Sequence, residues 1–345
     1  MTRRLPLLVL LAAVASACDF QPTLDIDTPE HEERLVLRAV LAADSVAVVR
    51  VGRSQDPYGG RRYDRVEETP AGRVTLLRDG RPVEVLRIRS ETCYDSSTGY
   101  NEETGEYGRP FECGAYVGTV PVEAGGTYTL RAEVAGLPTA EGTVTVPLRP
   151  TLTAAEEPRA AGAPRQFRLR LADPAGGDGR YGLAVLSRRA GFFSRTCEGE
   201  VCRDTSGYFL SPDRYPVSFE TSDPTLVAAA RQVPGDGIEF VTFTDQTFDG
   251  ETFAFTIEVD TQRRYDSGVA EGPLTVQLAA LSGDVYDAYQ ISYFSLGDDN
   301  PFAEPTNLPS NVVGGYGIVG AVALAEVAFL ARDGRAEVAG RAGGR

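Results

Sequence analysis

Residues 35–51 read LVLRAVLAADSVAVVRV, and this stretch predicts the class of fold. Two runs rich in Val and Leu, residues 35–41 and 45–51, are separated by the short connection Ala-Ala-Asp at 42–44. Short β-rich runs joined in this way are typical of neighbouring antiparallel strands. The chain is therefore expected to begin its folded part with a pair of β-strands.

Outward from this pair, the same pattern continues along most of the chain, with Gly, Pro or Asp-Gly between short runs. The further strand candidates are residues 73–77, 83–88, 116–120, 127–134, 142–146, 166–172, 181–187, 238–244, 252–259 and 274–281. This spacing predicts a mainly β protein, with an N-terminal immunoglobulin-like β-sandwich at 34–147 followed by a larger β-rich domain at 165–332. The Pro- and Ala-rich stretch 148–164 is interpreted as a linker. Tyr128 is expected to pack at a corner of the first domain.

One segment departs from the strand pattern. Val285 and Tyr289 recur at helical spacing and a glycine follows the segment, so residues 284–296 are predicted to form one substantial helix near the C-terminal end. The apolar, glycine-containing stretch 316–330 is expected to be a closing strand. Residues 333–345 are expected to be a disordered tail.

Residues 1–17 have the form of a secretory signal peptide, with two arginines, an apolar run at 5–14 and small residues directly before Cys18. The apolar run is about half of the ~20 residues that a membrane-spanning helix needs. The junction resembles a lipobox, so Cys18 is expected to be lipidated and to anchor an exported protein in the bacterial envelope through a tether at 18–33. The alternative is an ordinary signal peptide, cleaved after Ala17 to leave a free thiol.

The number of cysteines supports lipidation of Cys18. The five cysteines are Cys18, Cys93, Cys113, Cys197 and Cys202. An odd cysteine in an exported protein needs an explanation, and acylation of Cys18 supplies one. The other four fall into two local pairs, so disulfides Cys93–Cys113 and Cys197–Cys202 are predicted. Other pairings would have to join the two halves of the chain.

Charge and composition exclude several functions. The chain carries 34 basic and 49 acidic residues, a net charge of −15, so nucleic acid is not an expected partner and an anionic membrane would repel the surface as a whole. Every basic residue is Arg, and the absence of Lys excludes Schiff-base and P-loop lysine chemistry. The single histidine, His31, is predicted to be an exposed tether residue, so no catalytic triad, multi-histidine zinc site or cofactor is expected. Hydrolysis by a carboxylate pair is the enzyme class left open.

The stretch between Cys93 and Cys113 is the main candidate for a binding loop. It carries Tyr94, Tyr100 and Tyr107 among acidic residues. Tyrosine gives rigid amphipathic contact area at low entropic cost, and a disulfide would lower the ordering cost of binding. The alternative is a stapled solvent loop without a ligand.

Two acidic stretches could coordinate a cation. Asp245 with residues 249–251 lacks the alternating ligands of an EF-hand, so a hairpin turn at Asp249-Gly250 is the preferred interpretation. Residues 298–300 are interpreted as the end of a helix.

Residues 300–307, NPFAEPTN, followed by Ser-Asn at 310–311 and GYGIVG at 315–320, resemble a family of bacterial envelope lipoproteins, domain-of-unknown-function family 4249. The resemblance extends to the early strand pair and covers nearly the whole mature chain. It implies a lipid-anchored protein with an immunoglobulin-like part and a β-rich part, often found in company with TonB-dependent outer-membrane receptors. It therefore implies an outer-membrane receptor as a partner, and it carries no catalytic residues.

The stretch 300–320 is expected to be chiefly structural. Asn311 can satisfy backbone groups, Gly314 and Gly317 permit backbone geometry closed to other residues, and Phe302 is a candidate core anchor.

Two functional hypotheses follow. The first is a lipid-anchored envelope protein with a non-catalytic binding or scaffold role, accessory to a TonB-dependent outer-membrane transporter. The second is an envelope hydrolase that uses a carboxylate pair.

Overall fold

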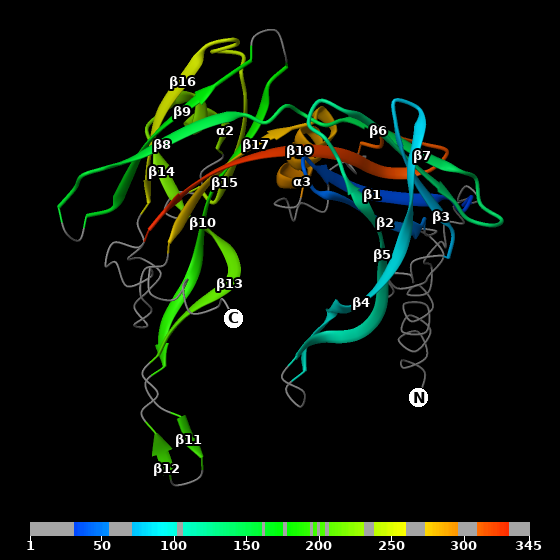
Figure 1. Cartoon of the computed structure of the whole chain (residues 1–345), viewed down its shortest axis with the longest axis horizontal. Helices are drawn as coiled ribbons and strands as arrows, with labels where there is room; N and C mark the ends of the chain where they lie inside the picture. The colour runs from blue at the N-terminus through cyan, green and yellow to red at the C-terminus, as the bar shows by residue number, and fades with distance from the viewer. Residues whose placement is uncertain are drawn as a thin grey trace, which may run out of the picture. The chain divides into compact units, whose positions relative to one another are not determined.

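The computed structural model describes residues 31–54, 71–101, 106–160, 163–174, 178–193, 196–198, 201–203, 207–230, 238–259, 273–295 and 309–330 (Figure 1). Across these ranges the chain is mainly β, as the sequence predicts, with two helices, α2 (Pro224–Ala229) and α3 (Gly283–Ser295). Neither of these two helices is long and apolar enough to span a bilayer.

Strands alone build the described part of the first half. They are β1 (Leu35–Ala42), β2 (Val46–Arg53), β3 (Arg73–Arg78), β4 (Arg81–Asn101), β5 (Glu106–Pro121), β6 (Thr127–Glu133) and β7 (Ala140–Thr145). Two strands from the end of the chain, β18 (Val312–Val313) and β19 (Tyr316–Phe329), join them. The order in the sheet is β19-β1-β2-β5-β4-β3-β6-β7-β18.

This sheet encloses one apolar core. Along β1, Leu35 and Leu37 are buried while Arg38 is exposed, as strand alternation requires. Leu76 of β3 and Leu130 of β6 belong to the same core as the leucines of β1. Because strands far apart in the sheet order share one core, the sheet must fold over on itself.

Tyr128 has the packing role predicted for it. Its side chain is 2% exposed, and its hydroxyl accepts a hydrogen bond from the backbone N–H of Glu123 at 2.8 Å. This contact to the backbone a few residues upstream fixes the turn before β6.

The immunoglobulin-like arrangement expected for residues 34–147 is not confirmed. Such a domain has two separate antiparallel sheets, whereas the described strands of this region form one continuous sheet. In addition, β1 runs parallel to β19. Alternation in the sequence predicts that a segment is a strand but not which strand it pairs with.

The second half combines two sheets. Its main strands are β8 (Thr151–Glu157), β9 (Arg165–Ala172), β10 (Arg180–Phe193), β13 (Gly207–Val217), β14 (Phe219–Thr221), β15 (Phe240–Thr244), β16 (Thr252–Val259) and β17 (Leu274–Leu281). A four-stranded sheet has the order β14-β16-β9-β8, while β17, β10 and β13 continue the large sheet beyond β19 and β15 pairs with β10. Phe167, Leu183, Phe243 and Phe255 lie in the core that these strands share. Residues 148–164, expected as a linker, contain β8 and so contribute a strand to this half.

β19 takes part in both cores. Residues 316–322 pair in parallel with β1, and residues 322–329 pair antiparallel with β17. Val319 lies in the first core, and Phe329 packs against the second. The predicted closing strand is therefore confirmed, and it links the two halves of the chain.

The predicted helix at 284–296 is confirmed as α3, with the observed bounds Gly283–Ser295. Its Tyr289 ring lies 4.6 Å from the ring of Phe240 in an edge-to-face contact, which fixes the helix against β15.

Helix α2 is not among the elements expected from the sequence. Asp223 accepts hydrogen bonds from the N–H groups of Thr225 and Leu226, and Pro224 occupies the first turn. Asp-Pro is a recognised helix start, but a helix of six residues has no periodicity that sequence reasoning can detect.

Candidate functional site

The structure brings three carboxylates together at the loops of the second half. Asp173 follows β9, Asp245 follows β15, and Asp249 lies in the connection to β16. One oxygen of each lies within 4.8 Å of the others. Asp173 and Asp245 are buried, and Asp249 is exposed. We refer to these three residues as the carboxylate cluster.

Hydrogen bonds from neighbouring loops hold the buried members of the cluster. Asp173 accepts from the Tyr181 hydroxyl at Oδ1 and from the Gly250 N–H at Oδ2, the latter at 2.9 Å. Asp245 accepts from the Gly179 N–H at 2.7 Å, and its own N–H donates to the Gly179 carbonyl at 3.1 Å. The two side chains therefore fasten the connections before β10 and before β16.

Tyr181 is the neutral partner in this arrangement. Burial raises the pKa of its phenol well above the ordinary value, and the hydrogen bond to Asp173 and the charges of Asp173 and Asp245 raise the pKa further. A phenol so shifted remains protonated and serves as a donor. This environment does not favour Tyr181 as a base or nucleophile.

Chemically, three carboxylates of this kind are the oxygen ligands that calcium or magnesium prefers. The donors around Asp173 and Asp245 account for the same geometry without a ligand, because each buried side chain meets backbone N–H groups of adjoining loops. The hydrogen bonds support a structural clamp between loops.

The turn predicted at Asp249-Gly250 is confirmed, but the hairpin is wrong. Gly250 has a φ of +73°, and the Glu251 N–H donates to the Phe248 carbonyl at 2.8 Å. However, β15 pairs with β10 and β16 pairs with β9, so the turn leads from one sheet to the other. Asp173 lies far from Asp245 along the chain, so no local sequence pattern predicts their contact.

The predicted binding-loop tyrosines lie on strands of a long hairpin. Among the described strands, β4 beyond Arg89 and β5 before Ala115 pair only with each other (Figure 1). The register places Tyr100 directly opposite Tyr107 near the end of this hairpin, and Tyr94 opposite Pro110. The tyrosines thus belong to a projecting β-ribbon.

The cysteines occupy neighbouring strands of two hairpins. In β4 and β5, Cys93 pairs with Phe111 and Glu91 pairs with Cys113, which makes the two cysteines diagonal neighbours in the strand ladder. Cys197 and Cys202 are direct partners between β11 (Thr196–Glu198) and β12 (Val201–Arg203).

Other predicted residues are located less fully. Cys18, residues 298–300 and Phe302 lie outside the described residues. His31 is half-buried and engaged in a contact, so its predicted full exposure is wrong. Asn311 has the predicted role, because its side chain donates to the Val319 carbonyl and accepts from the Val319 N–H.

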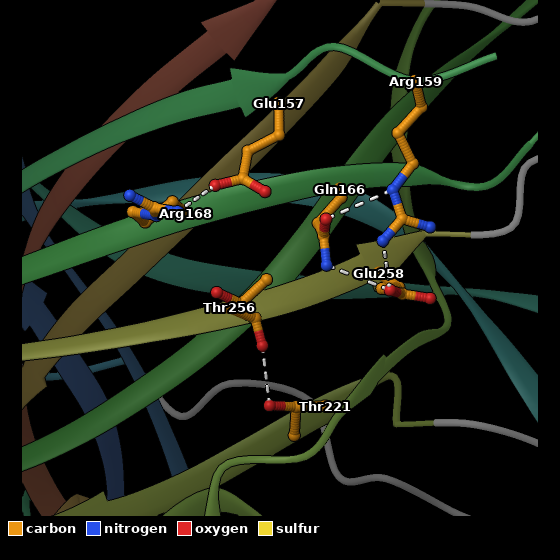
Figure 2. A network of polar contacts seen from close by, with 7 residues as sticks. All are labelled: Glu157, Arg159, Gln166, Arg168, Thr221, Thr256 and Glu258. Carbon is orange, nitrogen blue, oxygen red and sulfur yellow. Dashed lines mark hydrogen bonds and ion pairs between the residues drawn. The ribbon is translucent and has the colours of Figure 1, made fainter.

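The outer face of the four-stranded sheet carries a polar network (Figure 2). Arg159 donates to Glu258 at 2.8 Å, and Gln166 accepts from Arg159 at 3.2 Å and donates to Glu258 at 3.0 Å. Arg168 pairs with Glu157 at 2.5 Å. Partly exposed ion pairs contribute little singly, but here they link three segments of this sheet. The network therefore stabilises the four-stranded sheet.

Comparison with known proteins gives one family and a distant structural likeness. No curated protein matches the chain. A solved structure of the yeast delta-COP-I mu-homology domain matches over 87% of this chain and 97% of that chain, at 9% sequence identity and a TM-score of 0.20, which is too low to carry an argument. The sequence model of the family described as Domain of unknown function (DUF4249) matches residues 22–326. The chain belongs to this family.

Proposed function

We propose that this protein is a lipid-anchored component of the bacterial envelope with a non-catalytic binding or scaffold role, accessory to a TonB-dependent outer-membrane transporter. Cys18, directly after a signal-like segment, is the expected anchor. The partner is a protein, bound through the β4–β5 hairpin.

The observation that carries the binding role is the geometry of that hairpin. Its end pairs with no other described strand, and the register sets Tyr100 against Tyr107 there. Paired tyrosines offer a large contact area, and the strand ladder reduces the backbone freedom that binding would otherwise have to remove. Disulfide bonding of Cys93 to Cys113 would strengthen this effect.

A second candidate function, hydrolysis by a carboxylate pair, rests on the closeness of Asp173 and Asp245. A catalytic pair needs one acid free to protonate a leaving group and another free to meet water or substrate. Backbone N–H groups and the Tyr181 hydroxyl already donate hydrogen bonds to these two side chains, so neither is free for such a step. The binding role is therefore preferred.

A pull-down from detergent-solubilised envelopes tests the proposal. The wild-type chain should retain an outer-membrane transporter, and Tyr100→Ser with Tyr107→Ser should lose most of it. Tyr316→Ser is the matched control, because Tyr316 is an exposed tyrosine outside the hairpin. Equal recovery by all three proteins, or recovery by none, would contradict binding through the hairpin.

A further inference from the structure

The outward side of the large sheet carries a group of arginines interleaved with exposed valines. We call this group the arginine face, and it consists of Arg38, Val40, Val48, Arg50, Arg87 and Arg89. It belongs to β1, β2 and β4, on the side opposite the first core.

The strand register places these residues on one face. Arg38 is the direct partner of Arg50 across β1 and β2. Val48 of β2 and Arg87 of β4 are both partners of Val117 in β5, and Arg89 lies two residues beyond Arg87. Residues two apart in a strand point to the same side, so all of these side chains face outward together.

The arginines of this face lack the acidic partners that some arginines on other strands have. Arg131 pairs with Glu141 in the neighbouring strand, and Arg214 pairs with Glu326. By contrast, Arg38, Arg87 and Arg89 make no ion pair with any residue that the structure describes. No Asp or Glu occupies an outward position of β1 or β2.

Exposed valines lie among these cations. Val40 is 53% exposed and Val48 is 45% exposed. Arginine beside exposed aliphatic side chains suits the boundary between a polar headgroup layer and acyl chains, where the guanidinium meets phosphate and the aliphatic groups leave water.

We propose that the arginine face binds the anionic headgroups of the bilayer to which the chain is tethered. This inference rests on the proposed anchoring at Cys18. β1 begins 17 residues after Cys18. A segment of that length reaches at most ~60 Å. The anchor would therefore hold the start of β1 within that distance of the membrane surface.

Two attachments of different kinds explain why a protein of net charge −15 would carry this face. The total charge repels an anionic surface, so the arginine face binds weakly by itself and binds more firmly when the lipid holds the protein nearby. A lipid anchor combined with a basic patch gives firmer membrane attachment than either alone. Together, the lipid anchor and the arginine face would also orient the molecule, with the arginine face toward the headgroups.

Vesicle co-sedimentation of the full mature chain carrying Cys18→Ser measures how strongly the arginine face binds to membranes when no acyl group is present. The vesicles are phosphatidylcholine alone, or equal parts phosphatidylcholine and phosphatidylglycerol. Each arginine near an anionic surface is worth a factor of about five in binding. After allowance for the acidic remainder of the protein, we expect about tenfold stronger binding to the anionic vesicles, lost at high salt.

Arg38→Glu with Arg87→Glu should reduce binding to the level seen with phosphatidylcholine. The matched control is Arg168→Glu with Arg170→Glu, which makes the same charge change at exposed arginines of β9 in the four-stranded sheet and should retain most of the binding. The proposal would be overturned if the chain that carries only Cys18→Ser sedimented equally with both vesicle types. An equal loss of vesicle binding in the two double variants would also overturn it. Fatty-acid labelling of Cys18 is measured separately, so failure of the anchor and failure of the face can be told apart.

Discussion

At the scale of the residue, Tyr181 and Asp173 join two layers of the second half through one hydroxyl. Tyr181 is 3% exposed, and its hydroxyl donates to a carboxylate that also receives the Gly250 N–H. Hydrogen bonds to charged groups contribute more than neutral ones. This contact should therefore matter more than the neutral one made by Tyr128.

Tyr181→Phe should lower the free energy of unfolding by about 2 kcal/mol, because it leaves a buried carboxylate with one donor fewer. Tyr128→Phe, the matched control in the other core, loses a neutral bond and should cost about 1 kcal/mol. Urea denaturation of both variants checks the order. A Tyr181→Phe protein as stable as the wild type would show that Asp173 does not depend on this donor.

Alkaline pH provides a second test of the same residue. The folded-state pKa of Tyr181 is raised above its value of about 10 in the unfolded chain. Its contribution to stability is therefore complete below pH ~10 and is lost as the pH rises above that value, at up to ~1.4 kcal/mol per pH unit. Urea denaturation at pH 8 and at pH ~11 should show a steeper loss for the wild type than for Tyr181→Phe. Equal slopes would contradict the burial of this phenol.

At the scale of the element, β19 depends on a glycine. Gly317 has a φ of +111°, and a Cβ at this position would lie 2.0 Å from the Leu37 carbonyl oxygen in the paired strand. Gly317→Ala should therefore cost at least ~2 kcal/mol, because it adds backbone strain to a clash within the parallel pair.

Gly52→Ala is the control for that substitution. Gly52 pairs with Val36 on the other side of β1, and a Cβ there would have no atom within 4 Å. Its melting temperature should stay close to that of the wild type, whereas that of Gly317→Ala should fall by several degrees. Equal melting temperatures for the two variants would contradict the close approach of β19 to β1.

The hairpins offer a prediction about crosslinks. Cys197 and Cys202 are direct partners in the ladder, where Cα atoms lie about 4.5–5.5 Å apart, within the range a disulfide spans. Cys93 and Cys113 are diagonal neighbours in the ladder of β4 and β5. Peptide mapping of the mature protein without reduction should find both crosslinks, and free thiols at all four positions would show that the local pairing is wrong.

Local pattern was enough to predict many elements and none of their long-range partners. The two Val- and Leu-rich runs in 35–51 predict β1 and β2, the helical spacing of Val285 and Tyr289 predicts α3, and the apolar stretch 316–330 predicts β19. The parallel pairing of β1 with β19 brings together segments from opposite ends of the chain, and no local pattern encodes it. The contact of Asp173 with Asp245 was missed for the same reason.

At the scale of the whole molecule, β19 makes the two halves interdependent. Its first residues complete the core that contains Val319, and its last residue described, Phe329, packs against the core that contains Phe167 at a ring distance of 4.6 Å. Loss of the β1–β19 pairing should therefore weaken both halves. This dependence favours cooperative unfolding of the two halves.

Covalent attachment to the membrane is the central claim of the proposed function, since the hairpin and the arginine face are both proposed to act at the envelope. Metabolic labelling with a fatty-acid analogue, comparing wild type with Cys18→Ser, tests it most directly. The wild-type protein should carry the label and sediment with membranes, while Cys18→Ser should carry none and be released or remain an unprocessed precursor. Label that persists in Cys18→Ser, or a wild-type protein that takes up none, would contradict the account.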